Sequence, residues 1–151
     1  KVRRDEVSRR YLVALIDDIV VSAEYSSRGS GRWSLVGIDL TNPDGQASKP
    51  AWSVPLEGDP GEDSMITRLA WLAGVTPAGI AAVQVDPDAG AVRMQMVDPT
   101  TGTATVPTSL AIDDLTFAEV VGWRNGNLIL GADDKLLAID PATATIVNQA
   151  P

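Results

Sequence analysis

The chain has 151 residues, 44% of them hydrophobic, and a formal net charge of −8, which is the size and composition of one ordinary globular domain. It contains no cysteine and no histidine, which excludes a disulfide framework, a thiolate zinc site, a cysteine nucleophile and Ser-His catalysis. No apolar run in the sequence approaches the roughly 18 residues of a membrane-spanning helix.

The charge is unevenly distributed along the chain. Segment 1–10, KVRRDEVSRR, carries +3 and the remaining residues carry −11. Because an acidic surface repels phosphate backbones, we expect no nucleic-acid partner. We interpret segment 1–10 as a solvated basic linker. Two alternative interpretations remain: a tail that binds an acidic partner, and the remnant beside a lost membrane anchor. Since the chain begins at Lys1 rather than at a methionine, we expect a processed or excised chain, with a targeting segment, an anchor or further repeats outside it.

Short runs of apolar and β-branched residues, separated by Gly, Pro, Asp and Asn about every ten residues, predict strands rather than helices. The ten predicted strands cover 11–16, 18–25, 32–40, 80–86, 91–98, 104–112, 117–123, 127–133, 135–140 and 144–149. Segment 57–63, EGDPGED, is predicted as an acidic loop. Segment 65–74, MITRLAWLAG, is ambiguous between helix and strand, and the repeat described next favours strand. The sequence therefore predicts an all-β protein.

One pattern occurs three times: a strand, a polar turn, a strand that ends in apolar-x-apolar-Asp, a second turn and a final strand. The copies are anchored by aspartates 59 and 42 residues apart: Asp39, Asp98 and Asp140. We expect each carboxylate to accept hydrogen bonds from the backbone N–H groups just ahead of it. In the second copy Pro99 presets the first corner, and Gly102 supplies the left-handed position that closes the hairpin. In the third copy Ala144 replaces this glycine, so its turn is predicted to be either strained or of another type.

Three pairs of adjacent carboxylates raise the question of acid/base chemistry: Asp17/Asp18, Asp113/Asp114 and Asp133/Asp134. Adjacent residues on a strand point to opposite faces, and each pair lies beside an apolar run where a tight turn is expected. We therefore predict turns at all three pairs.

The segments Gly37-Ile38-Asp39, VDPTTG (97–102) and AIDPAT (138–143) resemble the blade repeat of the pyrroloquinoline-quinone-type (PQQ-like) β-propellers, over residues 11–149. In that family a tryptophan commonly follows the glycine, and Trp52 is similar to it. The resemblance implies that 11–151 is a propeller portion of about three antiparallel blades. Closed propellers have about four to eight blades. The expected fold is therefore an incomplete ring or part of a larger propeller, a ring completed by self-association of two copies, or an open β-sheet arrangement of another kind.

The sequence offers few candidates for a ligand site. Loops 39–45 and 86–90 place oxygen ligands beside glycine, so calcium binding is an alternative for both. Because their residues are typical turn formers, we predict turns there. No metal, cofactor or catalytic residue is assigned. The four tryptophans are predicted to fill gaps between sheets, with stacking on a sugar or a peptide as the alternative: Trp33, Trp52, Trp71 and Trp123. The best candidate for an exposed recognition loop is SSRGSGRW (26–33), through Arg28, Arg32 and Trp33.

The family resemblance implies either a quinone-cofactor dehydrogenase or a non-enzymatic scaffold outside the cytoplasm. Nothing in the chain resembles the dehydrogenase cofactor pocket, so the expected function is a non-enzymatic binding or scaffold module of the cell envelope or another extracytoplasmic site, presenting loops to a protein or small ligand. Two alternatives remain: a carboxylate-based hydrolase, and a sensor domain of a larger membrane-anchored protein with the basic head as its stalk.

Overall fold

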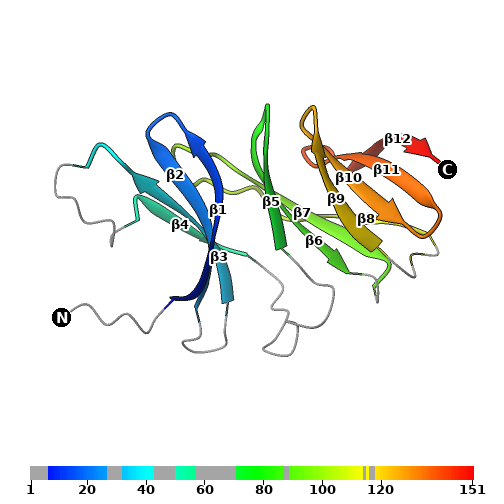
Figure 1. Ribbon diagram of the computed structural model, residues 1–151, viewed down its shortest axis with the longest axis horizontal. Helices are drawn as coiled ribbons and strands as arrows, with labels where there is room; N and C mark the ends of the chain where they lie inside the picture. The colour runs from blue at the N-terminus through cyan, green and yellow to red at the C-terminus, as the bar shows by residue number, and fades with distance from the viewer. Residues whose placement is uncertain are drawn as a thin grey trace.

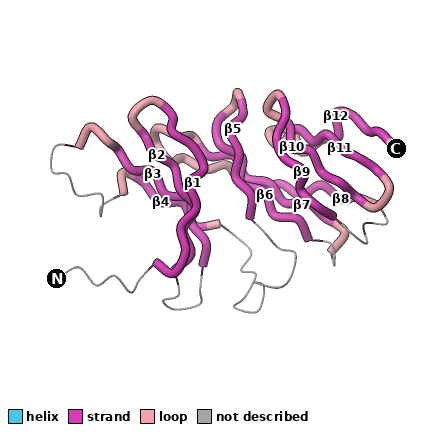
Figure 2. Tube along the Cα trace, viewed as in Figure 1, coloured by secondary structure: helices cyan, strands magenta, loops and turns pink. Residues whose placement is uncertain are grey.

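The computed structural model describes residues 7–26, 32–42, 50–56, 71–86, 89–113, 115 and 118–151. Throughout these ranges the regular elements are strands, and Figure 2 shows no helix among them. The all-β prediction is confirmed. No helix in the described part of the chain has the length and apolar character needed to cross a bilayer.

The twelve strands form three antiparallel sheets, and in each sheet four consecutive strands lie side by side in chain order. The first sheet contains β1 (Val7–Ile16), β2 (Ile19–Ser26), β3 (Arg32–Asp39) and β4 (Trp52–Pro55). The second contains β5 (Trp71–Thr76), β6 (Gly79–Asp86), β7 (Ala91–Val97) and β8 (Thr108–Ala111). The third contains β9 (Ala118–Arg124), β10 (Asn127–Ala132), β11 (Lys135–Asp140) and β12 (Thr145–Ala150). Figure 1 shows the three sheets in a row along the long axis, with the first and third at its two ends.

Each repeat has four strands rather than the three that the sequence pattern predicted. The first strand of each sheet, β1, β5 or β9, precedes these three. Strands β1 and β9 correspond to the predicted strands 11–16 and 117–123, whereas β5 was not among the ten. Strand β5 begins in the ambiguous segment 65–74, so the choice of strand is confirmed from residue 71, and 65–70 lie outside the described residues. Strand β4 was not among the ten predicted strands, because it is only four residues long and ends on Pro55.

Two predicted strands differ from the structure by more than one residue at an end. Strand β1 begins at Val7, inside the segment expected to be a basic linker, and Arg10 pairs with Glu24 of β2. The strand predicted at 104–112 is reduced to Thr108–Ala111 and one isolated bridge between Ala104 and Val97. Pro107 explains the interruption, because proline has no N–H to donate to a ladder.

The adjacent carboxylates form turns where the structure describes both members. Asp17 and Asp18 join β1 to β2, and Asp17 has a positive φ of 51°. Asp133 and Asp134 join β10 to β11, and Asp133 has a φ of 52°. Aspartate tolerates this left-handed region better than most residues, so the turn prediction is confirmed for both pairs. Asp113 also lies in a turn, whereas Asp114 is outside the described residues.

The sheets pack face to face, with one apolar cluster in each interface. The cluster between the first and second sheets includes Val21, Leu35 and Ile80, and the cluster between the second and third includes Val83, Met94 and Leu130. Strand β6 contributes to both because alternate residues point to opposite faces. It is buried from Ile80 to Val85. The second sheet is therefore enclosed on both sides, and the described strands form an open row rather than a closed ring (Figure 1).

Candidate functional site: aspartate corners and an aromatic cluster

The corner at Asp98 has the predicted Asx-turn geometry. One carboxylate oxygen, Oδ1, accepts hydrogen bonds from the backbone N–H groups of Thr100 at 2.9 Å and Thr101 at 2.8 Å. The N–H of Gly102 donates to the carbonyl of Asp98 at 2.9 Å, and Gly102 has a φ of 69°. The aspartate, Pro99 and glycine therefore act locally, as their spacing predicted.

The other two corners use the same chemistry. Asp39 accepts from the N–H of Thr41 at 2.8 Å and from its hydroxyl at 2.7 Å. Asp140 accepts from the N–H of Ala142 at 2.9 Å and from the hydroxyl of Thr143 at 3.0 Å. Ala144 has a φ of 53°, so alanine adopts the left-handed conformation that glycine provides in the second copy. Of the two predicted outcomes for this turn, the strained one is correct, at a cost of about 1–2 kcal/mol.

The hydrogen bonds of the corners lower the pKa of two aspartates. The pKa of Asp98 falls below 3.8 because the N–H groups of Thr101 and Thr100 stabilise its ionised form. The pKa of Asp39 falls because the hydroxyl and the N–H of Thr41 do the same. A general acid in glycoside hydrolysis needs the opposite shift, a raised pKa. These two carboxylates are therefore suited to accepting hydrogen bonds in turns and unsuited to donating a proton.

Trp52 joins the first sheet to the corner of the second. Its indole Nε1 donates a hydrogen bond to the carbonyl of Pro99 at 2.9 Å. A Cβ added at Gly102 would lie 2.6 Å from the side chain of Trp52, and one added at Gly37 would lie 2.1 Å from it. The indole therefore packs over one glycine of its own sheet and against another in the next sheet. This is the gap-filling role predicted for the tryptophans.

A second joint of tryptophan and glycine connects the second and third sheets. A Cβ added at Gly74 on β5 would lie 2.2 Å from the indole of Trp123 on β9. Trp123 packs at the margin of the second apolar cluster. Gap filling is thus confirmed for Trp52 and Trp123, whereas the side chain of Trp71 lies outside the described residues.

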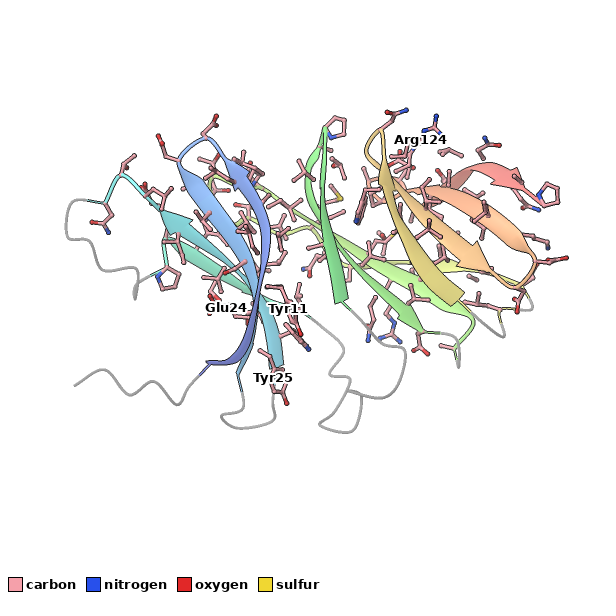
Figure 3. All side chains as sticks on the ribbon, in the orientation of Figure 1. Tyr11, Glu24, Tyr25 and Arg124 are labelled. Carbon is pink, nitrogen blue, oxygen red and sulfur yellow. The ribbon has the colours of Figure 1, made fainter. Side chains whose placement is uncertain are left out.

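Three aromatic rings gather at one end of the first sheet, on adjacent strands. The ring centroids of Tyr11 and Trp33 are 5.6 Å apart with planes at 29°, which is a stacked geometry. Those of Tyr25 and Trp33 are 5.5 Å apart with planes at 51°. Tyr11 is 55% exposed. Figure 3 shows Tyr11 and Tyr25 at the lower end of the first sheet. We call these three residues the aromatic cluster.

The predicted recognition loop coincides with this cluster at Trp33. Arg28 lies outside the described residues, and Arg32 is in β3 opposite Ser26, with a side chain that the structure does not describe. Sequence reasoning missed Tyr11 and Tyr25. A signal for Tyr25 was present in the sequence, because Tyr25 and Trp33 lie two residues before and two residues after segment 27–31. The structure pairs them across β2 and β3. Tyr11 had no such signal, since its place beside Trp33 depends on the pairing of β1 with β2.

The two loops considered for calcium are described only in part. In loop 86–90, Oδ1 of Asp86 accepts from the N–H of Ala89 at 3.0 Å, which is a turn interaction. Residues 43–49 and 87–88 are outside the described ranges. Within those ranges, no three acidic side chains are grouped so that they could hold a metal ion.

Comparison of the chain with protein-family models gives no match, and comparison with curated proteins gives no match either. The relation to PQQ-like propellers therefore stays a prediction, and the structure shows three packed four-stranded sheets.

Proposed function

We propose that this protein is a non-enzymatic binding module of the PQQ-like β-propeller type, in which the three sheets serve as blades. Support comes from the four-stranded meander repeated three times and from the aspartate corner in each copy. The resemblance also implies a tryptophan at the place of Trp52, whose indole donates a hydrogen bond to the corner of the following sheet. On the resemblance alone, we extend the proposal to an extracytoplasmic location.

The aromatic cluster is the surface that we propose for the partner, which is a protein or peptide. The observation that carries this proposal is the grouping of three rings on neighbouring strands, with Tyr11 55% exposed. Tyrosine and tryptophan supply a large contact area at a small cost in conformational entropy, and both are enriched at protein interfaces. A sheet holds such rings in place before binding, which lowers the entropy lost on association.

The rings of the cluster suggest the chemistry of the partner. Because aromatic rings pack favourably against apolar and aromatic side chains, the partner peptide is expected to present such a side chain to them.

A displayed random-peptide library tests this function. Peptides selected on the immobilised wild-type chain are expected to be rich in aromatic and apolar residues. Their dissociation constants, measured by fluorescence anisotropy, should rise at least about tenfold for Tyr11→Ala, as for a loss at an interface hot spot. Val106→Ala is the matched control, because Val106 is 83% exposed and lies outside the cluster, in the segment before β8. Failure to select any peptide, or equal binding by wild type and Tyr11→Ala, would overturn the proposal.

A further inference from the structure

The first and third sheets each have one outer face that no described sheet covers. Because the three sheets repeat one pattern, residues on these outer faces have equivalents on faces that are packed within the chain. The residues four positions before the corner aspartates are equivalent: Leu35, Met94 and Leu136. Leu35 packs against the second sheet and Met94 against the third. Each therefore faces the sheet that follows it. Leu136, at the same position of the third sheet, is 47% exposed on the outer face of that sheet.

The strand register identifies a second set of equivalent residues, on the first strand of each sheet. The pairs Leu15–Val20, Val75–Ile80 and Trp123–Leu128 occupy the same place in their sheets. The second residue of each pair also pairs, on its other side, with the residue just before the corner aspartate of its sheet. These residues are Ile38, Val97 and Ile139. Trp123 points to the preceding sheet, where it covers Gly74. Leu15, at the same position, is 62% exposed on the outer face of the first sheet.

The position that receives Trp123 also recurs on the outer face of the third sheet. Gly74 pairs next to the Val75–Ile80 pair, and Gly122 pairs next to the Trp123–Leu128 pair. A Cβ added at Gly122 would meet no described atom within 4 Å. Gly122 of the third sheet is thus the uncovered equivalent of Gly74, which Trp123 covers in the second sheet. Leu15 of the first sheet is the equivalent of Trp123.

The remaining residues of the two outer faces suit a sheet-on-sheet contact. Besides Leu15, the face of the first sheet carries Leu12, 75% exposed, together with Val36, which is buried. The face of the third sheet carries Ile129 and Leu136. Apolar side chains on such faces are released from water when a second sheet covers them.

We propose that two copies of this chain associate head to tail, with the outer face of the third sheet of each copy packed on the outer face of the first sheet of the other. Both contacts would repeat the packing mode of the two interfaces within the chain. Two copies supply six sheets, which lies within the range of about four to eight that closed propellers use. Each interface joins two different surfaces, and two such interfaces close a ring of two copies, so the assembly does not grow further.

The molar mass in solution tests the association. Sedimentation equilibrium of the wild-type chain should give twice the monomer mass of 15.9 kDa. A monomer at about 100 μM, above the dissociation constants typical of specific complexes, would overturn the proposal and would assign the faces to something other than a second copy. A mass that increases beyond two copies would overturn the closed arrangement.

Two charge substitutions test the head-to-tail geometry. Leu15→Lys disables the first-sheet face and Leu136→Glu the third-sheet face, and each variant alone should dissociate at least about tenfold more readily. A one-to-one mixture should recover a dimer, because it restores one interface in which both faces are wild type. If either variant remains as dimeric as wild type, or if mixing restores nothing, the head-to-tail geometry is wrong.

Two further variants keep the test interpretable. Val106→Glu introduces a charge at an exposed valine in the segment before β8, outside both faces, and should leave the mass unchanged. Circular dichroism checks that each variant folds, and Leu12→Lys on the same outer face replaces Leu15→Lys if the latter does not. The aromatic cluster is not part of these faces, so the mass measurement and the peptide selection fail or succeed independently.

Discussion

At the scale of single residues, the corner aspartates set the local conformation of the chain. Each carboxylate accepts hydrogen bonds from groups two or three residues ahead, so it replaces backbone partners that the turn cannot provide. The ionised form accepts these bonds better than the neutral form, which explains the lowered pKa values of Asp39 and Asp98. Folding and ionisation of these groups are therefore linked.

The linkage predicts the behaviour of Asp98→Asn. Because the pKa of Asp98 is lower in the folded chain than its ordinary value of 3.8, its charged form stabilises the fold above this value. That contribution is lost as the pH falls through the folded-state pKa. Asparagine keeps the acceptor oxygen but not the charge. The free energy of unfolding should therefore be larger for wild type than for Asp98→Asn at pH 7. This difference should shrink toward zero near pH 2, because Asp98 becomes protonated as the pH falls through its lowered pKa.

Urea unfolding at several pH values measures this difference. Asp113→Asn, in a turn beside β8, is the control for a general charge effect. An Asp98→Asn difference that is the same at pH 7 and pH 2 would contradict the assigned linkage.

At the scale of elements, tryptophan–glycine contacts hold the sheets together. Trp52 ends up between Gly37 and Gly102 because only glycine leaves room for the indole at both positions. Its hydrogen bond to Pro99 spans 47 residues of sequence. The corner of the second copy is thus both a turn and the place where the first sheet packs on the second.

Replacing Gly102 by alanine tests this double role. Gly102 and Gly90 both have positive φ, at 69° and 60°, so alanine is strained by about 1–2 kcal/mol at either position. At Gly90 the nearest atom to an added Cβ is the Ile112 carbonyl oxygen at 3.5 Å, an ordinary contact. At Gly102 the added Cβ collides with Trp52, which costs about 1–3 kcal/mol more. Chemical denaturation of both variants should show Gly102→Ala as clearly the less stable, and equal losses would refute the joint.

At the scale of the whole molecule, the second sheet is the best protected part of the row. Strand β6 is buried continuously from Ile80 to Val85, whereas the side chains of β12 are all exposed. Local opening is least frequent where both faces of a strand are covered, because opening must break two apolar interfaces. The middle of the row should therefore respond last to destabilising conditions.

Hydrogen exchange followed by mass spectrometry measures this gradient. Amides of β6 and β7 are expected to exchange slowest, and those of β12 fastest among the described strands. Strand β10, which is buried on alternate residues only, serves as the intermediate reference. At a concentration where the chain is monomeric, exchange in β12 as slow as in β6 would contradict the open-row arrangement.

The amino-acid sequence by itself determined the strand-rich class and the corners. Asp98, Pro99 and Gly102 act through contacts within four residues, so their chemistry can be read without the fold. The same locality made the turns at Asp17 and Asp133 predictable. Trp33 was also selected from the sequence, as part of an exposed loop beside a strand.

Only the tertiary structure decided which residues meet across the molecule. Trp52 reaches a corner 47 residues away, and Trp123 covers a glycine of another sheet, because the register of whole sheets fixes both contacts. The aromatic cluster formed in the same way, through the pairing of β1 with β2 and of β2 with β3. A sequence carries local hydrogen-bonding preferences directly, whereas contacts at long separation arise only after many weak packing interactions have been satisfied together.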